Sequence, residues 1–208
     1  MPDLSHLSPL PDPRGVPDLP AVCVLVLLGS LRRGSANRRL AHALAAAAPP
    51  GVLATVHPTL GDLAHYDQDI DLPEVRPAPV EALLAAVRGA DALIAVTPEY
   101  NGTTSSALKN AVDWASRPAR RSPLSGKPVA VIGAAFGQHG GVWAQTELRR
   151  AFEIAGARVL TEPVIAIGGA GARFAELAPE ADPELGTQLA ALYDAVRRAV
   201  AAGEGSAN

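Results

Sequence analysis

The feature of this chain that most constrains its fold is a series of short apolar runs that alternate with helical segments. The first run, residues 21–28, is continuously apolar, rich in Val and Leu, and bounded by Gly29. Such a run is typical of a strand that is buried on both faces of a sheet. It is also far shorter than the roughly 18 residues that a membrane-spanning helix needs. By the same criteria, further strands are predicted over 52–57, 90–96, 127–134 and 158–164.

Helices are predicted between these strands. Residues 36–48 are rich in Ala and Leu and stop at Pro49, and Pro183 precedes a stripe of Leu and Val at helical spacing. Three more helices are expected to end near Arg88, Ser116 and Ala155. Strands that alternate with helices form a parallel sheet with helices on both faces. The expected fold class is therefore α/β, a three-layer sandwich around a five-stranded parallel sheet.

The chain of 208 residues is expected to form one domain over 21–202, because 48% hydrophobic residues supply enough material for one core. A flexible N-terminal tail is predicted over 1–20, and a short C-terminal tail over 203–208. Proline resists both helix and ladder formation, and the N-terminal segment contains Pro2, Pro9, Pro11, Pro13, Pro17 and Pro20.

Composition excludes several classes of function. The net charge is −3, with 18 basic and 21 acidic residues, so the positive field of a nucleic-acid binder is missing. One cysteine excludes a disulfide framework, and the five histidines show no metal-binding spacing, so no metal site is expected. The first twenty residues lack the basic start of a secretory signal. We therefore expect a cytoplasmic protein without a membrane anchor.

Polar loops follow the first, third and fourth predicted strands, where doubly wound sheets bind their ligands. The first loop contains Ser30, Arg32, Ser35 and Asn37 and leads into a helix N-terminus. Hydroxyl, amide and guanidinium donors at such a position favour a terminal phosphate. Ser35 stands where the phosphate loop of nucleoside triphosphatases requires Lys, and the glycine pattern of dinucleotide sites is absent. The alternative is a solvated loop with a Ser helix cap.

The second and third loops have features that suit a flat ligand. In the second loop, Pro98 fixes the chain path, Tyr100 offers an aromatic face, and Asn101-Gly102 allows a tight turn. The third loop, 133–141, is rich in glycine, which lets the backbone approach a ligand closely. Taken singly, each loop is also compatible with an ordinary turn between a strand and a helix.

Three strings of residues together carry a resemblance to a known family. The strings are Gly29-Ser30-Leu31-Arg32-x-x-Ser35-x-Asn37, Pro98-Glu99-Tyr100-Asn101-Gly102 and Leu108-Lys109-Asn110-Ala111-x-Asp113-Trp114. They resemble the NADPH-dependent FMN reductase family of flavodoxin-like fold, which includes quinone, chromate and azo-dye reductases. The resemblance spans about residues 21–175. In this chain Ser105-Ser106 stands where the family usually carries Pro-Gly.

The resemblance implies that FMN binds beyond the ends of the first, third and fourth strands. Its phosphate would be held by Ser30, Arg32, Ser35 and Asn37. One side of the flavin ring would run along Pro98, Glu99, Tyr100, Asn101 and Gly102, and the other side would be flanked by Gly133, Phe136 and Gly137. No side chain is assigned as catalytic, because the flavin itself performs hydride transfer.

The activity implied by the resemblance is hydride transfer from NADPH or NADH to bound FMN and then to a small-molecule electron acceptor. Acceptors of the family include quinones, azo compounds, metal oxyanions and free flavins. Family members form dimers or tetramers, so a homodimer or homotetramer with FMN near the interface is expected, with 58–79 and 109–114 as interface elements. Two alternatives are an electron carrier without NAD(P)H activity and a flavin-loaded redox sensor that binds a protein partner.

Overall fold

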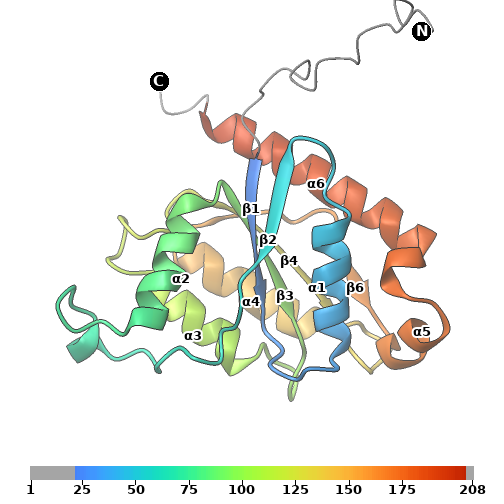
Figure 1. The fold of residues 1–208 in the computed structure, drawn as a ribbon, viewed down its shortest axis with the longest axis horizontal. Helices are drawn as coiled ribbons and strands as arrows, with labels where there is room; N and C mark the ends of the chain where they lie inside the picture. The colour runs from blue at the N-terminus through green and yellow to red at the C-terminus, as the bar shows by residue number, and fades with distance from the viewer. Residues whose placement is uncertain (1–21, 205–208) are drawn as a thin grey trace, which may run out of the picture.

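The computed structural model describes residues 22–204 and centres on one parallel sheet (Figure 1). Its strands are ordered β2-β1-β3-β4-β5, and β6 also pairs with β4. The bounds are β1 Val22–Leu28, β2 Val52–Val56, β3 Ala92–Thr97, β4 Pro128–Ala134, β5 Arg158–Val159 and β6 Ala166–Ile167. All pairs are parallel. The predicted α/β class is therefore confirmed.

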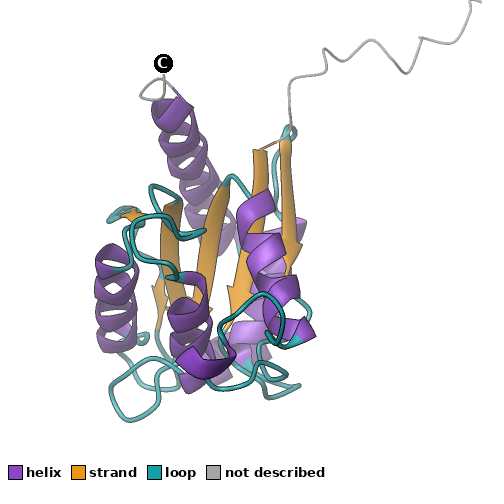
Figure 2. Ribbon diagram, turned by 90° about the vertical axis from the view of Figure 1, so that its left-hand side faces the viewer, coloured by secondary structure: helices purple, strands orange, loops and turns teal. Residues whose placement is uncertain are grey.

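Helices cover both faces of the sheet (Figure 2). One face carries α1 (Ala36–Ala46), α5 (Ala170–Glu176) and α6 (Pro183–Glu204), and the other carries α2 (Ala78–Gly89), α3 (Ser106–Ala115) and α4 (Val142–Ile154). Alternate residues of β1 enter the two cores, with Val24 and Val26 in one and Leu25 and Leu27 in the other. This explains why the β1 sequence is continuously apolar.

The fifth predicted strand is the main error of the sequence-based assignment. Regular strand pairing stops at Val159 and resumes at Ala166. Leu160 N still donates to Val129 O (2.8 Å), so it is residues 161–164 that leave the sheet. The physical reason for this interruption is a side chain of α4. Arg149 Nη2 donates a 2.9 Å hydrogen bond to Val131 O, a β4 carbonyl that would otherwise be available to the neighbouring strand. The single expected strand is thus two short ones, and the sheet has six strands instead of five.

Three short elements were also not predicted. Helix α5 follows β6, and two 3-10 turns cover η1 (Gln68–Ile70) and η2 (Pro179–Ala181). The predicted N-terminal tail falls outside the described residues. At the other end, α6 continues two residues beyond the domain boundary expected at 202.

The long connection between β2 and α2 is held in place by α3. Asn110 Oδ1 accepts a hydrogen bond from Tyr66 N (2.8 Å), and Asn110 Nδ2 and Trp114 Nε1 both donate to Ala64 O (2.9 and 2.8 Å). The Tyr66 ring packs edge-on against Trp114, with centroids 5.0 Å apart. Asn110 and Trp114 therefore anchor this connection to α3.

Within residues 22–204, no helix combines the length and apolar character required to cross a membrane.

Candidate functional site

The three loops singled out from the sequence meet at the carboxyl edge of the sheet, at the lower side of Figure 1. Strands β1, β3 and β4 are neighbours, and Gly29 N donates to Val96 O (2.9 Å) where β1 ends. Gly133, at the end of β4, lies opposite Thr97, and a Cβ atom on it would come within 2.5 Å of Thr97 O. Only glycine allows this close approach of the second and third loops.

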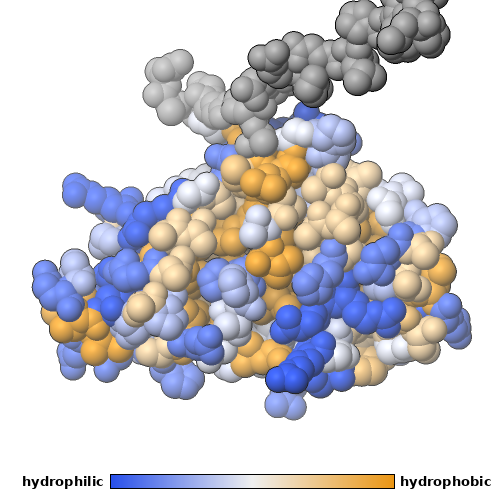
Figure 3. All heavy atoms as spheres, viewed as in Figure 1, coloured by the Kyte–Doolittle hydropathy of each residue, from blue (hydrophilic) through white to orange (hydrophobic). Residues whose placement is uncertain are grey.

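The first loop presents a row of backbone donors. Within the described part of the chain, the N–H groups of residues 30–34 donate to no other residue. Ser30 is buried, and Arg32 is exposed with its guanidinium 3.7 Å from the position of a Cβ on Gly34. Hydrophilic side chains gather over this loop on the surface (Figure 3). Free amides beside a guanidinium and a helix N-terminus are the donors that bind anions in proteins.

Ser35 begins α1 as its N-cap, and its hydroxyl oxygen accepts from Arg38 N at 3.0 Å. The hydroxyl hydrogen is still available to donate toward an anion.

Asn37 is engaged differently from the other three residues assigned to the phosphate. Its side chain is buried, with Oδ1 accepting from Ala134 N (2.9 Å) and Nδ2 donating to Ala134 O (2.8 Å). This pair of hydrogen bonds fastens the first turn of α1 to the end of β4. Asn37 therefore joins the first loop to the third.

The second loop is a tight turn at the end of β3. Tyr100 and Thr103 exchange two backbone hydrogen bonds of 3.0 and 3.1 Å, and Asn101 and Gly102 have φ angles of 54° and 77°. These left-handed conformations explain the Asn-Gly sequence, because Asn and Gly tolerate them best. Tyr100 is 51% exposed at the tip.

The third loop is shaped by contacts with residues 166–171. Ala135 N donates to Ile167 O (2.9 Å), Gly169 N donates to Gly137 O (3.2 Å), and Ala170 N donates to Ala135 O (3.0 Å). Phe136 is 75% exposed, and a Cβ on Gly171 would lie 2.6 Å from its ring. The backbone of this loop is thus fixed while the Phe136 ring faces solvent.

Two residues of α4 that support the site were missed by sequence reasoning. Gln145 is fully buried, and its Nε2 donates to Gly140 O (3.3 Å) and Ile165 O (3.2 Å). Glu147 accepts hydrogen bonds from the Thr103 hydroxyl and from Thr104 N (3.0 Å). These hydrogen bonds lower the pKa of Glu147. A Gln on the apolar face of a helix was the one signal available for Gln145.

The donor set of the site fits a phosphate-bearing, flat cofactor better than a metal ion. Across residues 22–204, no group of three His, Cys, Asp or Glu side chains lies close enough together to hold a metal. The first loop instead offers unpaired amides and a guanidinium, and the second and third loops offer closely approaching backbone at Gly133. Such a combination matches the phosphate and the ring of FMN.

Comparison with known proteins supplies the deciding observation. Residues 22–172 match the profile of the NADPH-dependent FMN reductases. The chain belongs to this family. Membership of the NADPH-dependent FMN reductases confirms the predicted oxidoreductase class and the dependence on FMN and NAD(P)H.

Individual relatives agree with the family assignment. The chain is 41% identical over 140 residues to a quinone reductase of Escherichia coli, covering 67% of this chain and 74% of the relative. It is also similar to the solved flavoenzyme NAD(P)H:(acceptor) oxidoreductase of Paracoccus denitrificans, with a TM-score of 0.72 and 30% identity over 86% of this chain and 98% of the other. A Pseudomonas aeruginosa flavodoxin shares the fold, with a TM-score of 0.53 and 22% identity over 84% and 99%. The flavodoxin-like fold is therefore confirmed.

Proposed function

We propose that this FMN reductase family member passes hydride from NADPH or NADH to bound FMN and then reduces a small-molecule acceptor. The observation that carries the proposal is the meeting of the three loops around Gly133, with a row of unpaired amides at the first loop. The acceptor class favoured here is the quinones, because a relative 41% identical in sequence is a quinone reductase. Azo compounds, metal oxyanions and free flavins are the other candidates.

The first loop would hold the FMN phosphate. Ser30 and Ser35 contribute hydroxyl groups, Arg32 contributes its guanidinium, and the amides of 30–34 contribute N–H donors. A charge-assisted hydrogen bond from Arg to phosphate is about twice as strong as a neutral one. For Asn37 we propose an indirect contribution, since both of its polar atoms already pair with Ala134.

The second and third loops would enclose the flavin ring. The turn from Pro98 to Gly102, including Glu99, Tyr100 and Asn101, would border one side, and Gly133, Phe136 and Gly137 would border the other. FMN, when bound, supplies the hydride chemistry, and the protein contributes binding and orientation. We assign no side chain as a general acid or base.

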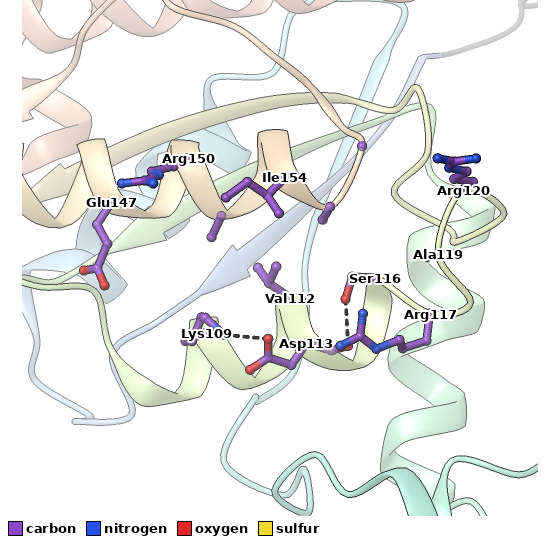
Figure 4. Close-up of a pocket in the computed structure, with 13 residues that line it drawn as sticks. Lys109, Val112, Asp113, Ser116, Arg117, Ala119, Arg120, Glu147, Arg150 and Ile154 are labelled. Carbon is purple, nitrogen blue, oxygen red and sulfur yellow. Dashed lines mark hydrogen bonds and ion pairs between the residues drawn. The ribbon is translucent and has the colours of Figure 1, made fainter.

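We further propose that the enzyme is a homodimer or homotetramer, with a second copy covering a groove between α3 and α4 (Figure 4). The groove has a volume of about 540 Å³, and Ile154 from α4 and Val112 from α3 point toward each other in it. Ile154 is 77% exposed. Charges of both signs line the rim, including Lys109, Asp113 and Arg150, which suits a self-complementary contact.

A cytoplasmic location and the absence of a nucleic-acid partner remain predictions from composition, based on the single cysteine and the net charge of −3.

Steady-state kinetics test the proposed reaction. With FMN-loaded protein, NADPH oxidation should depend on an added quinone and give parallel double-reciprocal lines, because both substrates use one flavin site in turn. An azo dye and chromate, assayed in the same way, rank the acceptor classes. Flavin-loaded protein that oxidises NADPH with none of these acceptors would contradict the proposal and favour a carrier or sensor.

A further inference from the structure

Glu147 connects two parts of the molecule that are far apart in sequence. It lies on the exposed surface of α4, and its Oε2 accepts hydrogen bonds from the Thr103 hydroxyl and from Thr104 N, which is 3.0 Å away. Both donors are at the end of the second loop, where the chain turns toward α3. One carboxylate oxygen therefore fixes two consecutive residues of this loop.

The internal geometry of the second loop does not set its position over the sheet. The reciprocal hydrogen bonds of Tyr100 and Thr103 define the turn itself. Its position is set at the base, where the hydroxyls of Thr97 and Thr104 are 2.9 Å apart and Glu147 accepts from Thr104 N and from the Thr103 hydroxyl. Removing the Glu147 carboxylate would leave the end of the loop with the Thr97–Thr104 contact and without its attachment to α4.

A second carboxylate connects the same loop to the same helix. Glu99 Oε2 accepts from Ala144 N at 3.2 Å, in the first turn of α4, where backbone N–H groups have no partner within the helix. Residues 144 and 147 both belong to α4 and are three positions apart. The start of the loop and its end are therefore both attached to this helix.

Charge also favours the arrangement at Glu147. Hydrogen bonds from Thr103 and Thr104, together with the nearby Lys109 ammonium group, lower the pKa of the carboxyl. The group is thus held in its ionised form, which only accepts hydrogen bonds and matches the two donors facing it.

We infer that Glu147 is a positioning residue of the flavin site, which acts through Thr103 and Thr104 to hold the second loop along one side of the ring. The inference rests on the proposed function, in which FMN lies between the second and third loops. In this inference Glu147 acts through these two residues and not by direct contact with the cofactor. Its loss should change the environment of the ring more than it changes folding.

The test compares Glu147→Ala and Glu147→Gln with wild type. FMN affinity, the visible circular dichroism of bound FMN and the flavin midpoint potential report on the ring environment. Glu147→Ala should weaken FMN binding about tenfold and alter both the dichroism and the potential. Glu147→Gln should restore most of the wild-type values, because the amide oxygen can accept from the same two donors. Glu153→Gln, an exposed carboxylate on the same helix, is the matched control and should behave as wild type.

Thr103→Val removes one donor from the opposite side and provides an independent variant if Glu147→Ala fails to fold. It should alter the dichroism in the same direction as Glu147→Ala. If the folded variants keep the FMN affinity, the dichroism and the midpoint potential of wild type, the inference about Glu147 is overturned and the proposed function is not. Failure of the wild-type protein to bind FMN would instead overturn the proposed function, and the inference with it.

Discussion

Arg32 is the residue on which the phosphate assignment most depends, because it supplies a permanent positive charge to the first loop. Arg32→Ala should weaken FMN binding by a factor of about 10 to 100, the value of one charge-assisted hydrogen bond. Fluorescence titration of FMN measures the change. The neighbouring exposed Arg33, changed to Ala, is the matched control and should retain near wild-type affinity. Equal losses in the two variants would point to general charge attraction instead of a specific contact.

Asp182 is a carboxyl group whose surroundings link the stability of the protein to pH. Burial by itself would raise its pKa, but the Leu185 N–H, the Arg173 guanidinium and the Glu184 N–H outweigh burial and lower the pKa. Asp182 Oδ1 accepts from both N–H groups at 3.1 Å, and Oδ2 lies 2.7 Å from Arg173 Nη2. The carboxylate thus caps the start of α6.

Because the pKa of Asp182 is lower in the folded state than in the unfolded state, ionised Asp182 stabilises the fold. This stabilisation is complete above the unfolded-state pKa, near 4, and is lost as the pH falls through the folded-state pKa. Asp182→Asn should therefore lose about 1–3 kcal/mol at neutral pH. Its stability should also depend less on pH below 4 than that of wild type. Urea unfolding over a pH series measures both effects. Parallel pH curves for the two proteins would contradict this assignment.

At the scale of elements, Asn37 connects α1 to β4. Asn37→Ala should lower the free energy of unfolding by about 2–4 kcal/mol, because the buried N–H and C=O of Ala134 both lose a partner. FMN affinity should fall as well, since the first loop is no longer fastened to the third. Thermal and urea unfolding measure the first effect, and FMN titration of the folded variant measures the second.

Ser35→Ala is a control for the stability part of this prediction only, because it removes one helix-cap hydrogen bond and should cost about 1 kcal/mol. It also removes a proposed phosphate contact and is therefore not a control for FMN affinity. An Asn37→Ala variant with unchanged stability would show that the pair of hydrogen bonds to Ala134 is unimportant.

The sequence predicted the elements whose patterns are strong. The bounds predicted for β1, β3 and β4 each agree with the observed bounds to within two residues. These central strands are buried on both faces, which gives them continuous apolar sequences. The edge was predicted less well. Residues 158–164 have the composition of a strand, but whether an edge strand forms depends on the helix that packs beside it, and Arg149 reaches the β4 edge there. This contact joins residues 18 positions apart and leaves no local pattern.

The candidate site was predictable to a similar extent. Loop residues with chemical groups are visible in sequence, whereas their supports, Gln145 and Glu147, lie on α4 and have no motif of their own. Glu147 is also 44 and 43 residues away from its partners Thr103 and Thr104. Asn37 shows the complementary problem. Its amide suits a phosphate by type, yet its partner in the structure is the backbone of Ala134.

At the scale of the whole molecule, the contact proposed between copies of the chain lies at the groove between α3 and α4. Ile154→Glu should shift the protein to a smaller species in light scattering coupled to gel filtration, because a charge would be buried in the proposed contact. Leu53→Glu is the matched control, since Leu53 is 58% exposed on β2, away from the groove. The same mass for wild type and Ile154→Glu would exclude this groove as the interface.

The central claim, that these three loops hold an FMN which NAD(P)H reduces, is tested most directly by one absorption experiment. The protein is mixed with FMN and desalted, its spectrum is recorded, and NADPH is added without oxygen. We predict that the flavin bands are retained after desalting and bleach on addition of NADPH. Retained bands that persist would contradict the reductase reaction, and the absence of retained flavin would contradict the site itself.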